Sequence, residues 1–406
     1  MRVFPAPSPP PPAGMFAKER MGFMPALCVA FVDELTEGER EEFEGLGSQD
    51  ERAAMVLGHP FIAEKLAGLQ LSDGKDNRRS VAAREEGNRH FSEGRYQAAL
   101  NKYCVAVAFA DQSGPDYSLA LANRSACLQR VGRQGRGLED MAAAERADYP
   151  RDKLYKLAER RAQCLADLGQ LTKARIELEK AAQMVQKGAL TGAAKDKFVA
   201  GLSKQLKKME GKEDREEEKE GEGREVMTTV ADVNPLFPSL ARGVEVRYTK
   251  DQGRFVVAQK LLPTGTVVLS EDPLGWALDV ERWGTHCQHC LTQVAVIAPC
   301  PRCASVAFCS QACMEAGLAL YHRHECGLSR LLAASALNNF CLMAVRAVAR
   351  HTAAELVELR GRLEGAPDIQ AGAGGVEEAY RGDDLRTGLD LVHHDHDLEP
   401  EERIHR

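Results

Sequence analysis

Residues 287–326 read CQHCLTQVAVIAPCPRCASVAFCSQACMEAGLALYHRHEC and set ligand residues in four short pairs. The pairs are Cys287 with Cys290, Cys300 with Cys303, Cys309 with Cys313, and His322 with Cys326. Because two or three residues separate the members of each pair, each pair forms a tight knuckle whose ligand atoms converge. Eight such ligands suit two closed, four-coordinate zinc sites. Closed sites are structural, since they leave no position for water or substrate.

Disulfides or unrelated thiols are the alternative interpretation of these cysteines. Seven of the 12 cysteines lie in this one segment, which is not the distribution of a small disulfide scaffold. The other five are scattered among apolar residues: Cys28, Cys104, Cys127, Cys164 and Cys341. The first residues, MRVFPAPSPPPPAG, lack the apolar core of a signal peptide, and the apolar run 25–32 is too short to span a bilayer. We therefore expect a protein of the cytoplasm and nucleus with no membrane partner.

Ahead of this segment, residues 80–185 contain a degenerate repeat of small residues in three copies, offset by 38 and 37 residues. The matched sets are Gly87, Gly94, Ala99 and Ala106; Ser125, Gly132, Gly137 and Ala144; and Ala162, Gly169, Ala174 and Ala181. Paired helices need small residues where they approach and glycine where the chain turns. The stretch resembles three tetratricopeptide repeats, because an ordinary helical bundle would not repeat glycines in register.

The remaining segments have simpler patterns. Residues 1–24 are proline-rich and predicted to be disordered, and residues 26–79 are predicted to form a helical lead-in and a linker. Helical spacing continues to residue 209, and residues 210–238 begin with nine acids against four bases, which is typical of a solvated linker. Residues 239–284 alternate β-branched and polar side chains, which predicts strands.

The cysteine segment resembles a MYND finger, a family in which the ligand pairs interleave. The resemblance implies that Cys287, Cys290, Cys309 and Cys313 hold one zinc ion, and that Cys300, Cys303, His322 and Cys326 hold the second. Metal binding then supplies about 10–16 kcal/mol of folding free energy per structural zinc.

MYND fingers bind proline-containing peptides, so the resemblance implies a partner of that kind. Leu318 stands where the family usually has an aromatic residue, which is a departure in the peptide groove. Two arginines in the finger are balanced by two glutamates, and the chain has a net charge of −7. Direct nucleic-acid binding therefore has no electrostatic basis.

The strands before the finger resemble the opening of a SET domain, the fold of protein-lysine methyltransferases. The matching residues are DQGRFVVA at 251–258, Gly265, and EDP at 271–273. A Gly-Arg turn also occurs in ordinary hairpins, but a SET opening followed by a MYND finger and helices is the order of the SET-and-MYND family. The repeats narrow the resemblance to its tetratricopeptide-bearing member. It implies S-adenosylmethionine as cofactor, beside Gln252, Gly253 and Arg254.

The catalytic half of a SET domain is not found in this sequence. That half carries an Asn-His-Ser/Cys segment and a later tyrosine, and this chain has no Asn-His dipeptide. Only 80 residues follow Cys326, and residues 327–406 resemble the helical insert that precedes the catalytic half. We therefore expect the chain to stop before its active site, and we assign no catalytic residue.

A second resemblance concerns the repeats. Tetratricopeptide domains that capture chaperone tails use a clamp of cationic and amide side chains on successive first helices. The matching residues are Arg84, Asn88, Asn123, Lys156 and Arg160, with Arg84 in place of a lysine. Such groups bind a terminal carboxylate and an acidic side chain. Asn-Arg pairs and exposed cations are also common in repeats without this function.

The predicted fold is therefore multidomain α+β: a tetratricopeptide-like solenoid at 80–209, the start of a split SET domain at 239–284, a two-zinc MYND finger at 287–326, and helices at 327–406. Two functions remain open. The chain is either part of an S-adenosylmethionine-dependent protein-lysine methyltransferase with recruiting modules, or a non-catalytic zinc-binding adaptor for chaperone tails and proline-containing peptides.

Overall fold

The computed structural model describes residues 23–67, 74–214, 230, 232–249, 253–329, 332 and 339–365. The chain divides into two compact units, which are described separately. The first comprises Met1–Glu220 with Leu278–Asn338, and the second comprises Gly221–Ala277 with Asn339–Arg406. Residues 1–22 of the proline-rich segment, residues 366–406 and much of the charged linker lie outside the described residues.

Four short helices begin the described chain: α1 (Phe23–Glu34), α2 (Glu37–Gly45), α3 (Gln49–Gly58) and α4 (Pro60–Ala67). Capping boxes start two of them, because Thr36 exchanges hydrogen bonds with Glu39, and Ser48 with Glu51. Their small core contains Leu27, Phe31, Leu35 and Ile62.

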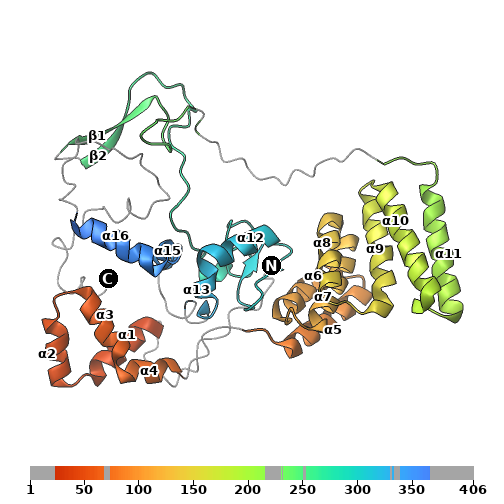
Figure 1. Cartoon of the computed structure of the whole chain (residues 1–406), viewed down its shortest axis with the longest axis horizontal. Coiled ribbons are helices and arrows are strands. Elements are labelled where there is room, and N and C mark those ends of the chain that lie inside the picture. The colour runs from red at the N-terminus through yellow and green to blue at the C-terminus, as the bar shows by residue number, and fades with distance from the viewer. Residues whose placement is uncertain are drawn as a thin grey trace. The chain divides into compact units, whose positions relative to one another are not determined.

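Three antiparallel helix pairs follow, as Figure 1 shows: α5 (Asn77–Ser92) with α6 (Tyr96–Phe109), α7 (Pro115–Arg130) with α8 (Gln134–Arg146), and α9 (Leu154–Asp167) with α10 (Leu171–Met184). Helix α11 (Gly192–Met209) closes the stack. The turn inside each pair holds a glycine at the same repeat position and in the left-handed region. These are Gly94, Gly132 and Gly169, with φ of 74°, 78° and 82°. The predicted tetratricopeptide-like fold is confirmed.

The finger contains the short hairpin of β3 (Ala298–Pro299) and β4 (Ala307–Phe308), in which Ala298 pairs with Phe308. Helical turns α12 (Gln311–Gly317), η4 (Leu318–His322) and α13 (Arg323–Glu325) follow. Ser310 begins α12 by accepting a hydrogen bond from the backbone N–H of Cys313 at 3.2 Å.

The finger packs against the solenoid within the first unit. One apolar cluster contains Leu100, Tyr103 and Leu128 of the solenoid together with Ile297 and Phe308 of the finger. All five residues are nearly inaccessible to solvent. The sequence did not predict this contact, because a charged linker and the SET-like strands separate the two modules along the chain.

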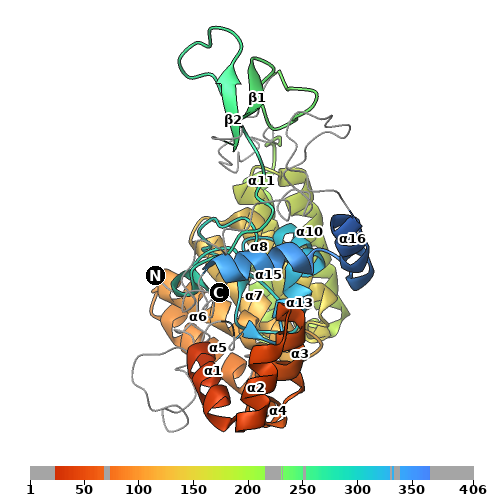
Figure 2. The same ribbon diagram turned by 90° about the vertical axis from the view of Figure 1, so that its left-hand side faces the viewer.

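In the second unit, β1 (Val244–Thr249) and β2 (Gly253–Ala258) form an antiparallel pair that lies side by side in both views (Figures 1 and 2). Elsewhere in the segment 239–284, which was predicted to form strands, Leu240 and Leu269 form only an isolated bridge. Helices α15 (Asn339–Ala349) and α16 (Ala353–Gly365) complete this unit. Within the described ranges, no helix is both long enough and apolar enough to cross a membrane.

Candidate zinc centres and peptide groove

The structure groups the eight predicted zinc ligands into two sets of four. Cys287, Cys290, Cys309 and Cys313 form one set, and Cys300, Cys303, His322 and Cys326 form the other. Within each set, one ligand atom from every residue lies within 4.8 Å of the others. The first and third pairs along the chain therefore converge, as do the second and fourth. The cysteines whose side chains are described, from Cys104 to Cys341, are all free of disulfides.

The distances inside each set fit a tetrahedral zinc ion. The Sγ atoms of Cys290 and Cys309 are 3.5 Å apart, those of Cys300 and Cys326 are 3.7 Å apart, and Nε2 of His322 is 3.4 Å from Sγ of Cys303. Zn–S bonds of about 2.3 Å place tetrahedral sulfur ligands roughly 3.7 Å from one another. Since these thiols and this imidazole are ligands that zinc prefers, both sets fit structural zinc.

Buried contacts hold the ligands in place. The Tyr321 hydroxyl donates to the backbone oxygen of Gln288 at 2.8 Å, which joins the last turn of the finger to its first knuckle. The rings of Phe308 and His322 meet edge to face, with centroids 5.8 Å apart. A Cβ on Gly317 would come within 2.6 Å of the Phe308 ring, so only glycine fits there.

A cation from outside the finger faces the second set. Gly74 forms an antiparallel bridge with Cys303, and Nζ of the next residue, Lys75, donates to the backbone oxygen of Ala108 in α6 at 2.7 Å. Burial lowers the pKa of Lys75, and the nearby sulfurs of Cys303, Cys300 and Cys326 oppose this effect. Three thiolates and one neutral imidazole around a bound Zn²⁺ would carry a net charge of −1, the sign that a neighbouring lysine favours.

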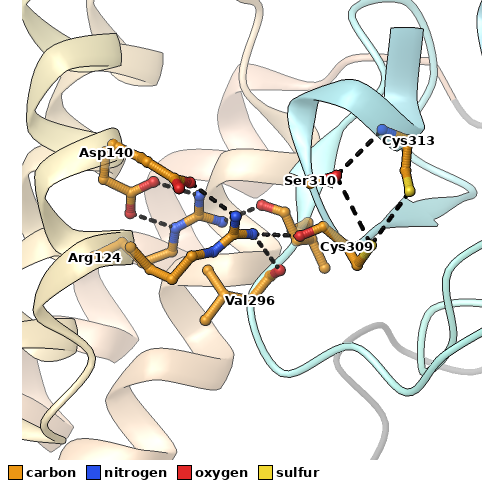
Figure 3. A network of polar contacts seen from close by, with 9 residues as sticks. Arg124, Asp140, Val296, Cys309, Ser310 and Cys313 are labelled. Carbon is orange, nitrogen blue, oxygen red and sulfur yellow. Dashed lines mark hydrogen bonds and ion pairs between the residues drawn. The ribbon is translucent and has the colours of Figure 1, made fainter. Parts of the chain in front are cut away.

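Arg124 of α7 connects the solenoid to the finger. Its Nη1 donates to the backbone oxygen of Ile297 at 2.9 Å, while Nε and Nη2 each donate to a carboxylate oxygen of Asp140 at 2.7 Å. Burial disfavours the charged guanidinium, but the Asp140 carboxylate more than offsets this effect, so the pKa of Arg124 lies above its ordinary value. Figure 3 shows this pair facing the finger.

Arg136 of α8 makes a second link. Its Nη2 donates to the backbone oxygen of Val296 at 3.3 Å and to that of Cys309, a predicted zinc ligand. Its Nη1 pairs with Glu139 at 2.8 Å. In Figure 3, Val296 and Cys309 face the solenoid, and Cys309 and Ser310 lead into α12, the helix that carries Cys313. We call Arg124, Arg136 and Asp140 the docking triad.

Hydrogen bonds across the first helices of the repeats bring together three of the five predicted clamp residues: Asn88, Asn123 and Arg160. Oδ1 of Asn88 on α5 accepts from Nδ2 of Asn123 on α7 at 2.8 Å and from the Tyr103 hydroxyl at 2.9 Å. Nη1 of Arg160 on α9 donates to the backbone oxygen of Ala122 at 2.6 Å.

The outer members of the predicted clamp are less constrained. Arg84 faces Asp116 at 3.9 Å, which is too long for a strong hydrogen bond. Lys156 is exposed, and its Nζ lies 5.8 Å from the centre of the Tyr155 ring. Lys156 is therefore able to reorient toward a ligand, whereas the Arg84 side chain is only 19% exposed.

Burial shifts two ionisable groups beside the groove. It raises the pKa of Tyr103 to about 12, because the phenolate would be desolvated. Burial also lowers the pKa of Arg160, although this group stays charged because an arginine begins far above neutral pH. Tyr103 thus acts as a neutral hydrogen-bond donor to Asn88, and Arg160 as a fixed cation.

The predicted cofactor residues are not assembled into a site by the described part of the chain. Gly253 and Arg254 begin β2, where they pair with Thr249 and Tyr248 of β1. Gln252 lies outside the described residues. The S-adenosylmethionine site beside these residues therefore stays a prediction.

The docking triad and Tyr103 were missed as functional residues by the sequence analysis. Arg124 did carry a signal, because it shares a helical face with buried Leu121 and Leu128 at spacings of three and four residues. A charge in an apolar stripe requires a partner. The partners themselves, Asp140 and the backbone of residue 297, are set by tertiary structure alone.

Comparison with known proteins gives one family match and several relatives. The model described as "MYND finger" matches residues 287–326. "Protein-lysine N-methyltransferase SMYD4" of Gallus gallus is 29% identical over 308 residues, covering 69% of this chain and 41% of that protein. The Homo sapiens protein of the same name is 28% identical over 298 residues, covering 67% of this chain and 36% of that protein.

The chain is homologous to SET-and-MYND proteins. It spans only about two fifths of the length of the relatives it matches. Among solved structures, "First TPR of Spaghetti (RPAP3) bound to HSP90 peptide SRMEEVD" matches 33% of this chain and 97% of that chain, at 20% identity and a TM-score of 0.26.

Proposed function

We propose that this chain is the recruiting part of a SET-and-MYND protein and that it binds an acidic carboxy-terminal peptide in the groove of α5, α7 and α9. One observation carries the proposal. Asn88 bonds to Asn123, and Arg160 bonds to the same turn of α7, so amides and a cation from three successive repeats meet. A chaperone tail with acidic residues before its free carboxylate is a ligand of this class.

The chemistry of the groove matches such a ligand. Since both bonds to Asn88 use Oδ1, its amide nitrogen is the atom that can donate to a carboxylate. Arg84, Lys156 and Arg160 supply positive charge, and an ammonium or guanidinium bonded to a carboxylate makes the stronger, charge-assisted kind of hydrogen bond. The terminal carboxylate and one acidic side chain therefore distinguish the proposed ligand from a neutral peptide.

Peptide titration tests the proposal. Full-length chain loaded with zinc is titrated with a peptide ending in SRMEEVD and with the same peptide amidated at its terminus. We expect binding of the free acid and a loss of about tenfold or more on amidation, since one charge-assisted hydrogen bond contributes about 1.5–3 kcal/mol.

Lys156→Ala with Arg160→Ala should abolish binding, whereas Lys153→Ala, on the preceding exposed turn, should leave it unchanged. Equal affinity for both peptides, or unchanged affinity of the double variant, would refute the groove as the site.

Lysine methylation is the activity that the relatives' names carry, and we propose it for the whole protein rather than for these 406 residues. Calorimetric titration of the chain with S-adenosylmethionine tests whether these 406 residues bind the cofactor by themselves. We expect no detectable heat, because the described residues assemble no cofactor site. Binding in the micromolar range would show that the chain holds the cofactor and that a methyl acceptor should be sought.

Binding of a proline-containing peptide by the finger is a separate proposal, drawn from the MYND match. Leu318 is half-buried against the cluster shared with the solenoid, at the position where the family has an aromatic residue. Titration of the chain with a proline-rich peptide, with Leu318→Trp as the comparison, tests it: the variant should bind more tightly. We also propose that the protein works in the cytoplasm and nucleus, which imaging of a tagged chain would check.

A further inference from the structure

Helix α7 is contacted on two sides within four consecutive residues. Ala122 and Ser125 accept hydrogen bonds from Arg160 at 2.6 and 3.1 Å, and Asn123 donates to Asn88. Arg124 lies between them and donates to the finger and to Asp140. Neighbouring residues of a helix point about 100° apart, so the same turn carries groove contacts on one side and finger contacts on the other.

The hydrogen bonds between the solenoid and the finger depend on a folded metal centre. Arg124 and Arg136 donate to backbone oxygens of residues 296, 297 and 309, which flank the β3–β4 hairpin. The predicted zinc ligands Cys300 and Cys309 directly follow β3 and β4, respectively. A finger of about 40 residues has little core of its own, so these oxygens keep their positions only while zinc is bound.

The apolar cluster also connects the finger to the groove. Tyr103 belongs to the cluster shared with the finger, and its hydroxyl donates to Asn88 in the groove. Leu100 and Leu128 are in that cluster with Ile297 and Phe308. If the finger unfolds, this face of α6 and α7 becomes exposed, and the side chains that support Asn88 and Asn123 lose their packing partners.

We propose that the zinc-loaded finger braces the peptide groove through α7, so that zinc occupancy controls the affinity of the groove for its peptide. The affinity part of this inference rests on the proposed function of the groove, whereas the bracing of α7 does not. Zinc loss or thiol oxidation in the finger then weakens recruitment. While zinc is bound, the finger stays packed against the solenoid of the same chain.

Two measurements on the full-length chain test the proposal. The first is hydrogen exchange of α7 without peptide, in the zinc-loaded protein and after removal of zinc by a chelator. The second is the dissociation constant of the acidic peptide in the same two states. We expect faster exchange in α7 and roughly tenfold weaker binding without zinc, a coupling of ordinary size between two sites. Far-UV circular dichroism should show that the solenoid keeps its helices.

Matched variants separate docking from metal loss. Arg136→Ala removes a docking contact while all eight zinc ligands remain, and Arg146→Ala changes an exposed arginine of the same helix. Arg136→Ala should raise α7 exchange and weaken peptide binding in the presence of zinc, and Arg146→Ala should do neither.

Each remaining outcome is decisive. Unchanged α7 exchange on zinc removal would overturn the proposal, and so would loss of all solenoid helicity, because the finger would then be needed for folding itself. If α7 exchange rises but the zinc-loaded chain binds no acidic peptide, the proposed function of the groove is wrong while the brace stands. If peptide binds equally well with and without zinc, the groove is correct and its control by zinc is wrong.

Discussion

Arg124 and Asp140 form an ion pair whose two hydrogen bonds are both 2.7 Å long, with only 3% and 8% of the respective side chains exposed. Removing two charges from water is costly, and their mutual attraction compensates only when the geometry is good and the remaining donors are used. Here the third nitrogen of the guanidinium, Nη1, donates to the backbone oxygen of Ile297 at 2.9 Å and contacts Sγ of Cys104 at 3.9 Å. The docked finger therefore supplies the shorter of the two Nη1 contacts.

Arg124→Met should destabilise the chain by about 3–5 kcal/mol, because Asp140 is left buried without a partner. The double variant Arg124→Met with Asp140→Leu should recover most of that loss, since no unpaired charge remains. Urea unfolding of the zinc-loaded proteins measures both changes. A double variant as unstable as the single one would show that the loss comes from the finger contact and not from the unpaired carboxylate.

Two zinc ions per chain are expected, one for each ligand set. Cys313→Ser should reduce the stoichiometry to one, because it removes a thiolate from the first set only. Cys341→Ser changes an exposed cysteine outside both sets and should leave two ions bound. A thiol-modifying reagent releases the metal, and a colorimetric chelator then measures the number of zinc ions per chain. Retention of two ions in the Cys313 variant would contradict the assignment.

The local parts of this structure were predictable and the tertiary contacts were not. The glycines at residues 94, 132 and 169 mark turns that need a left-handed residue, and knuckle spacing fixes which cysteines pair. Both signals act over a few residues. The contact between Arg124 and Ile297 joins residues 173 positions apart, and neither segment carries a sequence pattern that predicts contact with the other. Strands were predicted across residues 239–284, yet Leu269 forms only an isolated bridge, because alternation indicates half-burial while a strand also needs a partner strand.

Tyr103 gives a prediction for alkaline pH. Its pKa is raised to about 12 in the folded chain, against about 10 when unfolded, so the folded state favours the neutral phenol. Its contribution to stability is complete below pH 10 and is lost as the pH rises through 12. Ultraviolet difference titration of the wild type against Tyr103→Phe should show one tyrosine that ionises near pH 12. A difference spectrum centred at pH 10 would contradict its burial.

Two glycines three residues apart allow the cost of backbone strain to be measured without any change in packing. Gly132 has a φ of 78°, and Gly135 lies inside α8; an added Cβ meets nothing within 4 Å at either position. Gly132→Ala should therefore cost about 1–2 kcal/mol from left-handed strain alone. Gly135→Ala should stabilise the chain by roughly 0.5–1 kcal/mol, because alanine loses less backbone entropy in a helix. Urea unfolding of both variants measures the two effects, and shifts of the same sign would show that the turn does not require glycine.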